Sequence, residues 1–285
     1  MNDDLSELWD TAESFALPMK MRFRGITVRD GVLLRGPAGW AEFAPFHNYT
    51  DQQCVPWLLA AVEAATVGWP QRLRDSIEVN TTVPVVSPEK AYELVTASGC
   101  RTAKVKVADP GSVPGHDVER VAAVRDALGA GGKVRVDANG AWTVDEAIAA
   151  IRALDTAAGG LEYVEQPSGT VAELAAVRRA VDVPIAADES IRLAADPLLV
   201  ALAGAADIAV LKCAPLGGVR AALDVAAASG LTVVVSSALD TSVGLTAALA
   251  LAGALPDLPY ACGLGTGTLM TADVSSSALL PIGGG

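Results

Sequence analysis

An α/β fold, in which a barrel of repeated strand–helix units follows a smaller α+β region, is predicted by three observations on this chain of 285 residues. Five lysines and carboxylates each end a short β-like run, and they recur at intervals close to one strand–helix–strand unit of roughly 30 residues or somewhat fewer. The predicted strands are almost wholly apolar, as strands buried on both faces are. The length suits one barrel of about 200–250 residues and a small extra module.

The region 1–76 does not follow this rhythm. Three short strands and one helix are predicted there: Arg22–Arg29, Gly31–Arg35, Trp40–Ala44 and Asp51–Val67. Arg29-Asp30-Gly31 is typical of a hairpin turn, and Thr50 is a candidate N-cap for the helix. We therefore expect a small N-terminal α+β capping domain, completed by the C-terminal tail, residues 266–285.

Strands and Ala-rich helices alternate over residues 77–265. The predicted strands are Ile77–Val83, Thr102–Val107, Lys133–Asp137, Leu161–Glu165, Pro184–Ala187, Asp207–Leu211, Thr232–Val235 and a weak Pro259–Cys262. The predicted helices include Val118–Leu128, Val144–Ala157, Val171–Val181 and Val219–Ser229. Eight strands without a final helix predict a (β/α)7β modified TIM barrel.

Composition narrows the class of partner. Hydrophobic residues make up 51% of the chain, enough for a large core, and the net charge is −12. Such a charge repels phosphate backbones and anionic lipid, so we expect neither nucleic acid nor membrane as a partner. The four cysteines lack metal-site spacing and no signal segment opens the chain, which predicts a cytoplasmic protein with free thiols.

Three acids end three successive predicted strands: Asp137, Glu165 and Asp188. The C-terminal ends of barrel strands meet on one face, so these carboxylates would converge there. Hard oxygen ligands suit Mg²⁺, which takes few carboxylates and keeps positions for water or substrate. We predict a Mg²⁺ site on these three residues, with Mn²⁺ as the alternative ion; the competing interpretation is that each acid only caps a helix.

Three lysines would surround that site. Lys104 and Lys106 lie two residues apart in one strand, so both point into the barrel. A buried lysine beside another cation gives up its proton more readily and can act as a base, so this lysine pair is a candidate to supply one. Lys212 ends an apolar strand and would face the acids from the opposite side. The alternatives are a lysine pair that reaches solvent, and a structural pair between Lys212 and Asp188.

Five further residues are candidates for binding or orientation. Arg135 shares a strand face with Asp137 and could hold a substrate carboxylate through two hydrogen bonds, the alternative being an ion pair with one of the acids. Ser236 and Ser237 follow a strand, where backbone N–H groups can bind a carboxylate. Asn139 and Glu189 lie beside the acids and are candidates to orient them, Asn139 also to contact the substrate.

These residues resemble those of the enolase superfamily. The Lys104/Lys106 pair, the three acids and Lys212 are similar to the framework of its muconate-lactonising subgroup, and the chain most resembles short actinobacterial members. The resemblance spans nearly the whole chain and includes three segments: Gly39–Pro45, Arg135–Asn139 and Ser236–Gly244. The capping domain is shorter than in many relatives, and Asp240 stands where a Glu is expected.

The resemblance implies a Mg²⁺-dependent lyase with a small anionic substrate. The implied reaction is syn-dehydration of 2-succinyl-6-hydroxy-2,4-cyclohexadiene-1-carboxylate in menaquinone biosynthesis. Lys106 would remove the α-proton and return it to the leaving hydroxyl, while Lys212 stabilises the anionic intermediate. Racemisation of N-acyl amino acids or epimerisation of dipeptides, with the two lysines as opposed acid and base, is the second hypothesis. A non-enzymatic metal-binding or scaffold barrel is the third. The oligomeric state stays open, a monomer included.

Overall fold

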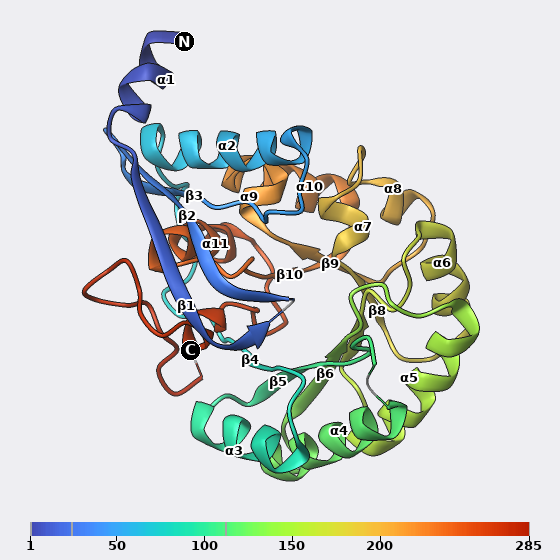
Figure 1. The fold of residues 1–285 in the computed structure, drawn as a ribbon. Coiled ribbons are helices and arrows are strands. Elements are labelled where there is room, and N and C mark those ends of the chain that lie inside the picture. The colour runs from blue at the N-terminus through green and yellow to red at the C-terminus, as the bar shows by residue number, and fades with distance from the viewer. Residues whose placement is uncertain (1, 24, 112, 285) are drawn as a thin grey trace.

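A curled sheet of seven parallel strands forms the main body of the computed structural model, which describes residues 2–23, 25–111 and 113–284. Its spatial order is β10-β9-β8-β7-β6-β5-β4 (Figure 1). The strands are β4 Thr81–Val83, β5 Thr102–Lys106, β6 Lys133–Asp137, β7 Tyr163–Glu165, β8 Ile185–Ala187, β9 Ile208–Leu211 and β10 Thr232–Val235. Each lies at a predicted place, although β4 begins four residues later than predicted.

Helices cover the outer face of the sheet, as α3 to α6 do in Figure 1. The helices of the barrel region are α3 Pro88–Ser98, α4 Pro114–Leu128, α5 Val144–Ala158, α6 Val171–Ala180, α7 Glu189–Arg192, α8 Leu199–Leu202, α9 Cys213–Leu216, α10 Val219–Ser229 and α11 Ser242–Ala254. Thr143 and Thr170 begin α5 and α6 with capping boxes, in which the carboxylates of Glu146 and Glu173 accept a hydrogen bond from the backbone N–H of the capping threonine. No helix in the described part of the chain has the length and apolarity needed to cross a bilayer.

Residues 261–263 close the sheet into a barrel. Cys262 makes a parallel bridge with Val79, just before β4, and Gly263 makes one with Ser236, just after β10. Backbone hydrogen bonds from Asn80 N to Cys262 O (2.9 Å) and from Gly263 N to Val235 O (2.8 Å) join the two edges. The weak eighth strand therefore appears as two bridges rather than a full strand, and the prediction of a (β/α)7β barrel behind an α+β region is confirmed.

The N-terminal region is an antiparallel sheet with two helices. Its elements are α1 Asn2–Trp9, β1 Glu13–Phe23, β2 Ile26–Gly36, β3 Gly39–Phe43 and α2 Asp51–Thr66. Thr50 caps α2 as predicted, whereas α1 and most of β1 were not predicted.

The predicted hairpin turn is wrong. The turn lies between Phe23 and Ile26, where Gly25 has φ +80°. Gly31 instead lies inside β2, where an added Cβ would come within 2.5 Å of the Ala44 Cβ. This glycine allows close packing between segments and does not form a turn.

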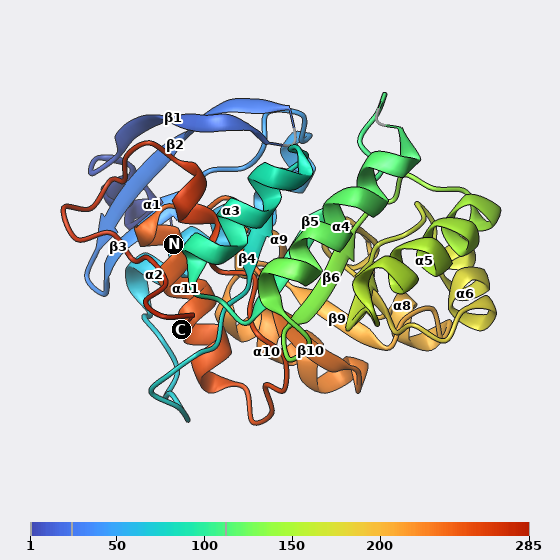
Figure 2. The same cartoon turned by 90° about the horizontal axis from the view of Figure 1, so that it is seen from below.

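The C-terminal segment lies against the N-terminal sheet (Figure 2). After the 3-10 helix η1 (Thr266–Leu269), Met270 bridges Met19 of β1, and Thr271 N donates to Pro18 O at 2.9 Å. Both methionines belong to a buried cluster that also takes in Trp57 of α2 and Leu239 of the barrel. The boundary between residues 76 and 77 stays a prediction.

Candidate active site

The predicted charged residues lie side by side at the C-terminal ends of the strands. In the sheet register Lys106 pairs with Asp137, and Asp137 pairs with Glu165. Asp188 and Lys212 directly follow β8 and β9. Apolar side chains fill the interior beneath them: Tyr163, Ala186, Ile208, Val210 and Val234. The backbone pairing therefore gathers the charges into one buried layer, with lysines from β5 and β9 on either side of the acids.

Each acid faces an ammonium group. Lys104 Nζ lies 2.9 and 2.7 Å from the two carboxylate oxygens of Glu165, and 3.4 Å from Asp137 Oδ2. Lys106 Nζ donates to Asp137 Oδ2, and Lys212 Nζ lies 2.5 Å from Asp188 Oδ2. The interpretation that these acids only cap helices is not supported for Asp188, whose side chain makes no capping hydrogen bond.

The buried charges shift one another's pKa. Burial opposes ionisation of Asp137, but Lys106 and Lys104 outweigh it and hold the pKa of Asp137 below its usual range. For Glu165 the balance is reversed, since burial and then repulsion by Asp137 raise its pKa to about 7. Burial also lowers the pKa of Lys212, against the attraction of Asp188. At Glu165, the ammonium group of Lys104 therefore does not fully offset burial and the repulsion by Asp137.

A divalent cation would supply that charge. Three buried carboxylates from adjacent strands provide the hard oxygen donors that Mg²⁺ prefers. As the side chains stand, no three acidic, His or Cys groups among the described residues are arranged to hold a metal ion, because each acid is turned toward a lysine. The donor chemistry therefore fits Mg²⁺, on condition that the acids exchange their lysine contacts for the ion.

Asn139 and Glu189 connect the two ends of this layer. Asn139 accepts a hydrogen bond from Lys106 Nζ at 2.8 Å and donates through Nδ2 to Glu189 Oε1 at 3.1 Å. Its backbone N–H also donates to Asp137 Oδ1 at 3.0 Å. Asn139 has φ +48°, in the left-handed region, which asparagine adopts more readily than most other residues that carry a side chain.

Three residues at the site were missed in the sequence. Arg192 donates to Asp188 Oδ1 at 3.0 Å and to Glu189 Oε1 at 2.7 Å, and also to the hydroxyl of Tyr49 from the N-terminal domain. Gln166 Oε1 accepts from the backbone N–H of Asp188 at 3.0 Å. Arg192 follows Asp188 by four residues, a spacing that places two side chains on one helix face and could have indicated the pair.

Arg135 does not reach the site, which corrects its prediction as a substrate ligand. It is fully buried, and its guanidinium contacts Glu162 just before β7, the backbone oxygen of Ala261 at 2.7 Å and the ring of Tyr163. These partners lie deeper in the barrel, toward the N-terminal ends of the strands. The alternative, an ion pair with one of the three acids of the charged layer, is also wrong, because the partner of Arg135 is Glu162.

A narrow pocket opens above the charged layer. Its volume is about 30 Å³, and it is lined by Lys104, Lys106, Asp137, Asn139 and Lys212, by Ser236 to Leu239, and by Phe23 and Phe46 of the N-terminal domain. Pockets for small molecules usually measure about 300–1,000 Å³, so a substrate must displace some of the lining side chains. Ser236 and Ser237 lie where they were predicted, and their role as substrate ligands stays a prediction.

Comparison with known proteins agrees with this geometry. Family models match as enolase C-terminal domain-like over residues 87–284 and as enolase N-terminal domain-like over residues 14–65. The chain is 61% identical over 274 residues to the o-succinylbenzoate synthase of Thermobifida fusca (strain YX), covering 96% of this chain and 86% of that protein. It is 56% identical over 275 residues to the o-succinylbenzoate synthase of Mycobacterium tuberculosis (strain ATCC 25618 / H37Rv), covering 96% and 83%.

Solved structures share the fold. The L-Ala-D/L-Glu epimerase from Bacillus subtilis matches with a TM-score of 0.78 and 26% identity, covering 92% of this chain and 90% of that one. The muconate lactonizing enzyme from Pseudomonas fluorescens matches with a TM-score of 0.80 and 23% identity, covering 94% and 90%; at that identity the match concerns the fold alone. With both family models matched and relatives above half identity over nearly its whole length, the chain belongs to the enolase superfamily.

Proposed function

We propose that this chain is an o-succinylbenzoate synthase. Such an enzyme dehydrates 2-succinyl-6-hydroxy-2,4-cyclohexadiene-1-carboxylate to 2-succinylbenzoate in menaquinone biosynthesis. One observation carries the proposal: relatives of that name are 55% to 61% identical over 96% to 98% of this chain. The buried layer of acids between two lysines supports it, because the reaction needs a base at one carbon and stabilisation of the negative charge that develops.

Lys106 is the proposed base. It removes the proton next to the substrate carboxylate, and the electron pair of that C–H bond is delocalised into the carboxylate to give an anionic intermediate. When this pair returns to form the new ring double bond, the C–O bond to the hydroxyl group breaks. The same ammonium group then gives its proton to the leaving oxygen, so that water departs from the face on which the proton was taken. Asn139, 2.8 Å from Lys106 Nζ, holds the amine in place, and Lys104 adds positive charge beside it.

Lys212 is the proposed electrostatic partner on the far side. Its ammonium group lies across the acids from Lys106, because β6, β7 and β8 separate the two strands in the sheet. There it stabilises the negative charge of the intermediate without moving a proton. Glu189, through Asn139 and Arg192, orients both ends of the layer.

Asp137, Glu165 and Asp188 are the proposed Mg²⁺ ligands, with Mn²⁺ as the alternative. Divalent-metal use is general in the superfamily, and the raised pKa of Glu165 supports a cation there. When bound, the ion supplies positive charge next to the substrate carboxylate. The backbone at Ser236 and Ser237 is proposed to hold another polar part of the small anionic substrate. The four cysteines are free thiols, which supports a reducing compartment such as the cytoplasm.

Loss of diene absorbance on mixing purified protein with the cyclohexadiene substrate tests the proposal, with Mg²⁺ and with EDTA. Rapid loss that EDTA abolishes is the expected result. If folded protein that binds Mg²⁺ shows no turnover, the proposal is rejected and epimerisation is favoured. The likeness to the L-Ala-D/L-Glu epimerase then makes the dipeptide L-Ala-L-Glu the first substrate to test. Exchange of the α-hydrogen of dipeptides in D2O would then identify that second activity.

A further inference from the structure

The loop between β10 and α11 forms one wall of the catalytic pocket. Ser236, Ser237, Ala238 and Leu239 all line it. Leu239 has φ +63°, in the left-handed region that residues with a Cβ atom rarely adopt. Such a conformation persists only where neighbouring groups hold it, so the contacts that fix Leu239 also fix this wall.

Arg29 of the N-terminal domain makes the contact to Leu239. Its Nε donates to the backbone oxygen of Leu239 at 3.0 Å, and its Nη2 donates to the backbone oxygen of Ala44. The side chain is 2% exposed. A guanidinium has a rigid planar set of donors, so one buried side chain sets the distance between the barrel loop and the segment after β3.

The same guanidinium contacts a second wall of the pocket. Arg29 Cζ lies 5.1 Å from the centre of the Phe46 ring, and Phe46 also lines the pocket. Arg29 therefore lies against two pocket walls, one from each domain, without itself lining the pocket.

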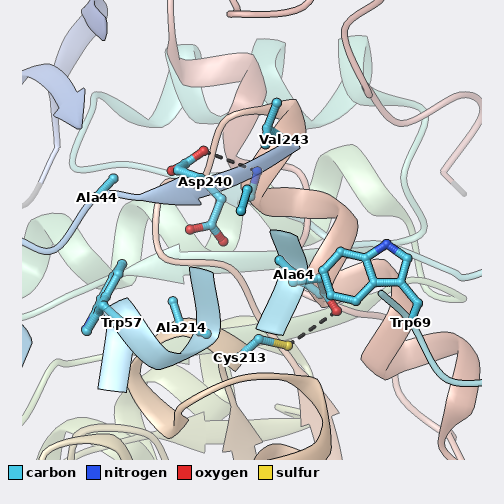
Figure 3. Close-up of a pocket in the computed structure, with 14 residues that line it drawn as sticks. Ala44, Trp57, Ala64, Trp69, Cys213, Ala214, Asp240 and Val243 are labelled. Atoms are coloured by element: carbon cyan, nitrogen blue, oxygen red, sulfur yellow. Dashed lines mark hydrogen bonds between the residues drawn. The ribbon is translucent and has the colours of Figure 1, made fainter. Parts of the chain in front are cut away.

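Glu42 of β3 holds the far end of the loop. Its Oε2 accepts hydrogen bonds from Thr241 N at 3.0 Å, from the Thr241 hydroxyl and from Gly244 N at 3.2 Å. A cavity of about 30 Å³ lies behind the loop, with Asp240 and Val243 on one side and Trp57 and Ala64 of α2 on the other (Figure 3). The loop is therefore placed by these hydrogen bonds together with the apolar packing of Ala238 and Leu239 in their buried cluster.

We propose that Arg29, supported by Glu42, is a positioning residue that holds Leu239 and Phe46 at the spacing the substrate needs. Arg29 does not touch the reacting atoms. It acts through the backbone of the loop that carries Ser236 and Ser237. The kinetic side of this proposal rests on the proposed function, whereas the effect on the loop does not.

Arg29→Lys tests the proposal, because lysine keeps the charge but cannot reach both backbone oxygens. The expected result is a KM for the cyclohexadiene substrate raised about tenfold or more, as the loss of a hydrogen bond from a charged group would give, with kcat nearly unchanged. Arg35→Lys is the matched control, since Arg35 lies on the same strand, is exposed and contacts only the Trp40 ring among the described aromatic side chains. An unchanged KM in folded Arg29→Lys would overturn the proposal.

Leu239→Gly provides a second variant. Glycine adopts φ +63° without strain, so the loop should depend less on Arg29, and Arg29→Lys should raise KM less in the Leu239→Gly background than in the wild type. If Arg29→Lys raises KM at least as much in the Leu239→Gly background as in the wild type, Arg29 does not act through Leu239. Both kinetic comparisons are made on protein whose thermal unfolding shows it to be folded.

Amide hydrogen exchange separates the two proposals. Arg29→Lys should speed exchange in residues 236–241 and leave the rest of the barrel as in the wild type, whether or not the protein turns over the cyclohexadiene. If neither protein turns over the cyclohexadiene but the loop of Arg29→Lys exchanges faster than the loop of the wild type, only the proposed function is rejected. Unchanged exchange in the loop would overturn the role of Arg29. If Arg29→Lys does not fold, Glu42→Ala, which removes the acceptor of the Thr241 and Gly244 hydrogen bonds, is measured in the same way, with the same expected and contrary results.

Discussion

Lys106 and Lys212 belong to the same charged layer, yet the proposed chemistry gives them different tasks. Lys106→Ala should reduce turnover by about 10²- to 10⁴-fold, the usual contribution of a general base, while Mg²⁺ binding measured by calorimetry survives because no metal ligand is removed. Lys90→Ala is the matched control, since Lys90 is exposed on α3 and pairs only with Glu93 among the described acids. Retained activity in Lys106→Ala would remove this lysine from the mechanism.

Arg135 is expected to matter for stability and not for the reaction. Arg135→Met leaves Glu162 without its buried partner, and breaking such a pair typically costs about 3–5 kcal/mol of unfolding free energy. Urea unfolding measures this loss, and Glu162→Gln should show one at least as large, because it leaves the fully buried guanidinium of Arg135 without its counter-charge. Per folded molecule, KM should stay within about threefold of the wild-type value; a large rise in KM would restore Arg135 as a substrate ligand.

The error about Arg135 shows what strand periodicity can and cannot predict. Alternation correctly placed Arg135 and Asp137 on one strand face, but the rise of about 3.3 Å per residue also puts Arg135 almost 7 Å deeper. Partners at that depth, Glu162 and Ala261, come from other parts of the chain. Lys106, Lys212 and the three acids were easier to place because each ends or directly follows its strand, where the fold itself brings the residues together.

The capping domain stabilises barrel helices through their N-termini. Glu63 of α2 accepts hydrogen bonds from Val219 N and Arg220 N at the start of α10, as Glu42 does at the start of α11. A carboxylate at a helix N-terminus satisfies free N–H groups and complements the helix dipole. The Glu42 side chain is only 3% exposed, so burial, then repulsion by Asp240, raise its pKa from the usual 4.5 to about 7.

That shift predicts a pH-dependent stability difference between the wild type and Glu42→Gln. A carboxyl whose pKa is higher in the folded state stabilises most below its unfolded pKa, and this contribution is lost as pH rises through 7. Wild type should therefore lose stability relative to the variant between pH 5 and 8, by up to about 3 kcal/mol. Urea unfolding at pH 5 and at pH 8 measures this stability difference. Glu165 titrates in the same pH range, but it is present in both proteins, so its contribution cancels in the comparison. Parallel curves for the two proteins would contradict the burial of a titrating Glu42.

Elements were predictable from the sequence where local signals and packing agree. The strand Lys133–Asp137 and the helix Val219–Ser229 have the predicted bounds, because apolar runs and helix-forming alanines coincide there with burial. The prediction of the hairpin turn failed because Gly31 allows close packing against Ala44, a contact that the neighbouring sequence does not reveal. The eighth strand is reduced to bridges at Cys262 and Gly263, which only barrel closure creates.

The charge of the whole molecule complicates any test of metal binding. With a net charge of −12, the surface attracts divalent cations diffusely as well as at the site. Diffuse attraction is screened by salt, whereas a buried site is screened much less. A decisive measurement must therefore compare Mg²⁺ with NaCl at equal ionic strength.

Under that condition Mg²⁺ should raise the thermal midpoint of the wild type. Binding to the folded state alone stabilises it by about 2.7 kcal/mol at a concentration 100 times the Kd, or roughly 5–10 °C for a chain of this size. Glu165→Gln removes a proposed ligand and the carboxyl whose pKa burial raises to about 7, so most of the shift should disappear. Glu93→Gln, an exposed acid on α3, should keep the full shift. Equal shifts in all three proteins would mean that Mg²⁺ binds only diffusely and that the three acids do not form its site.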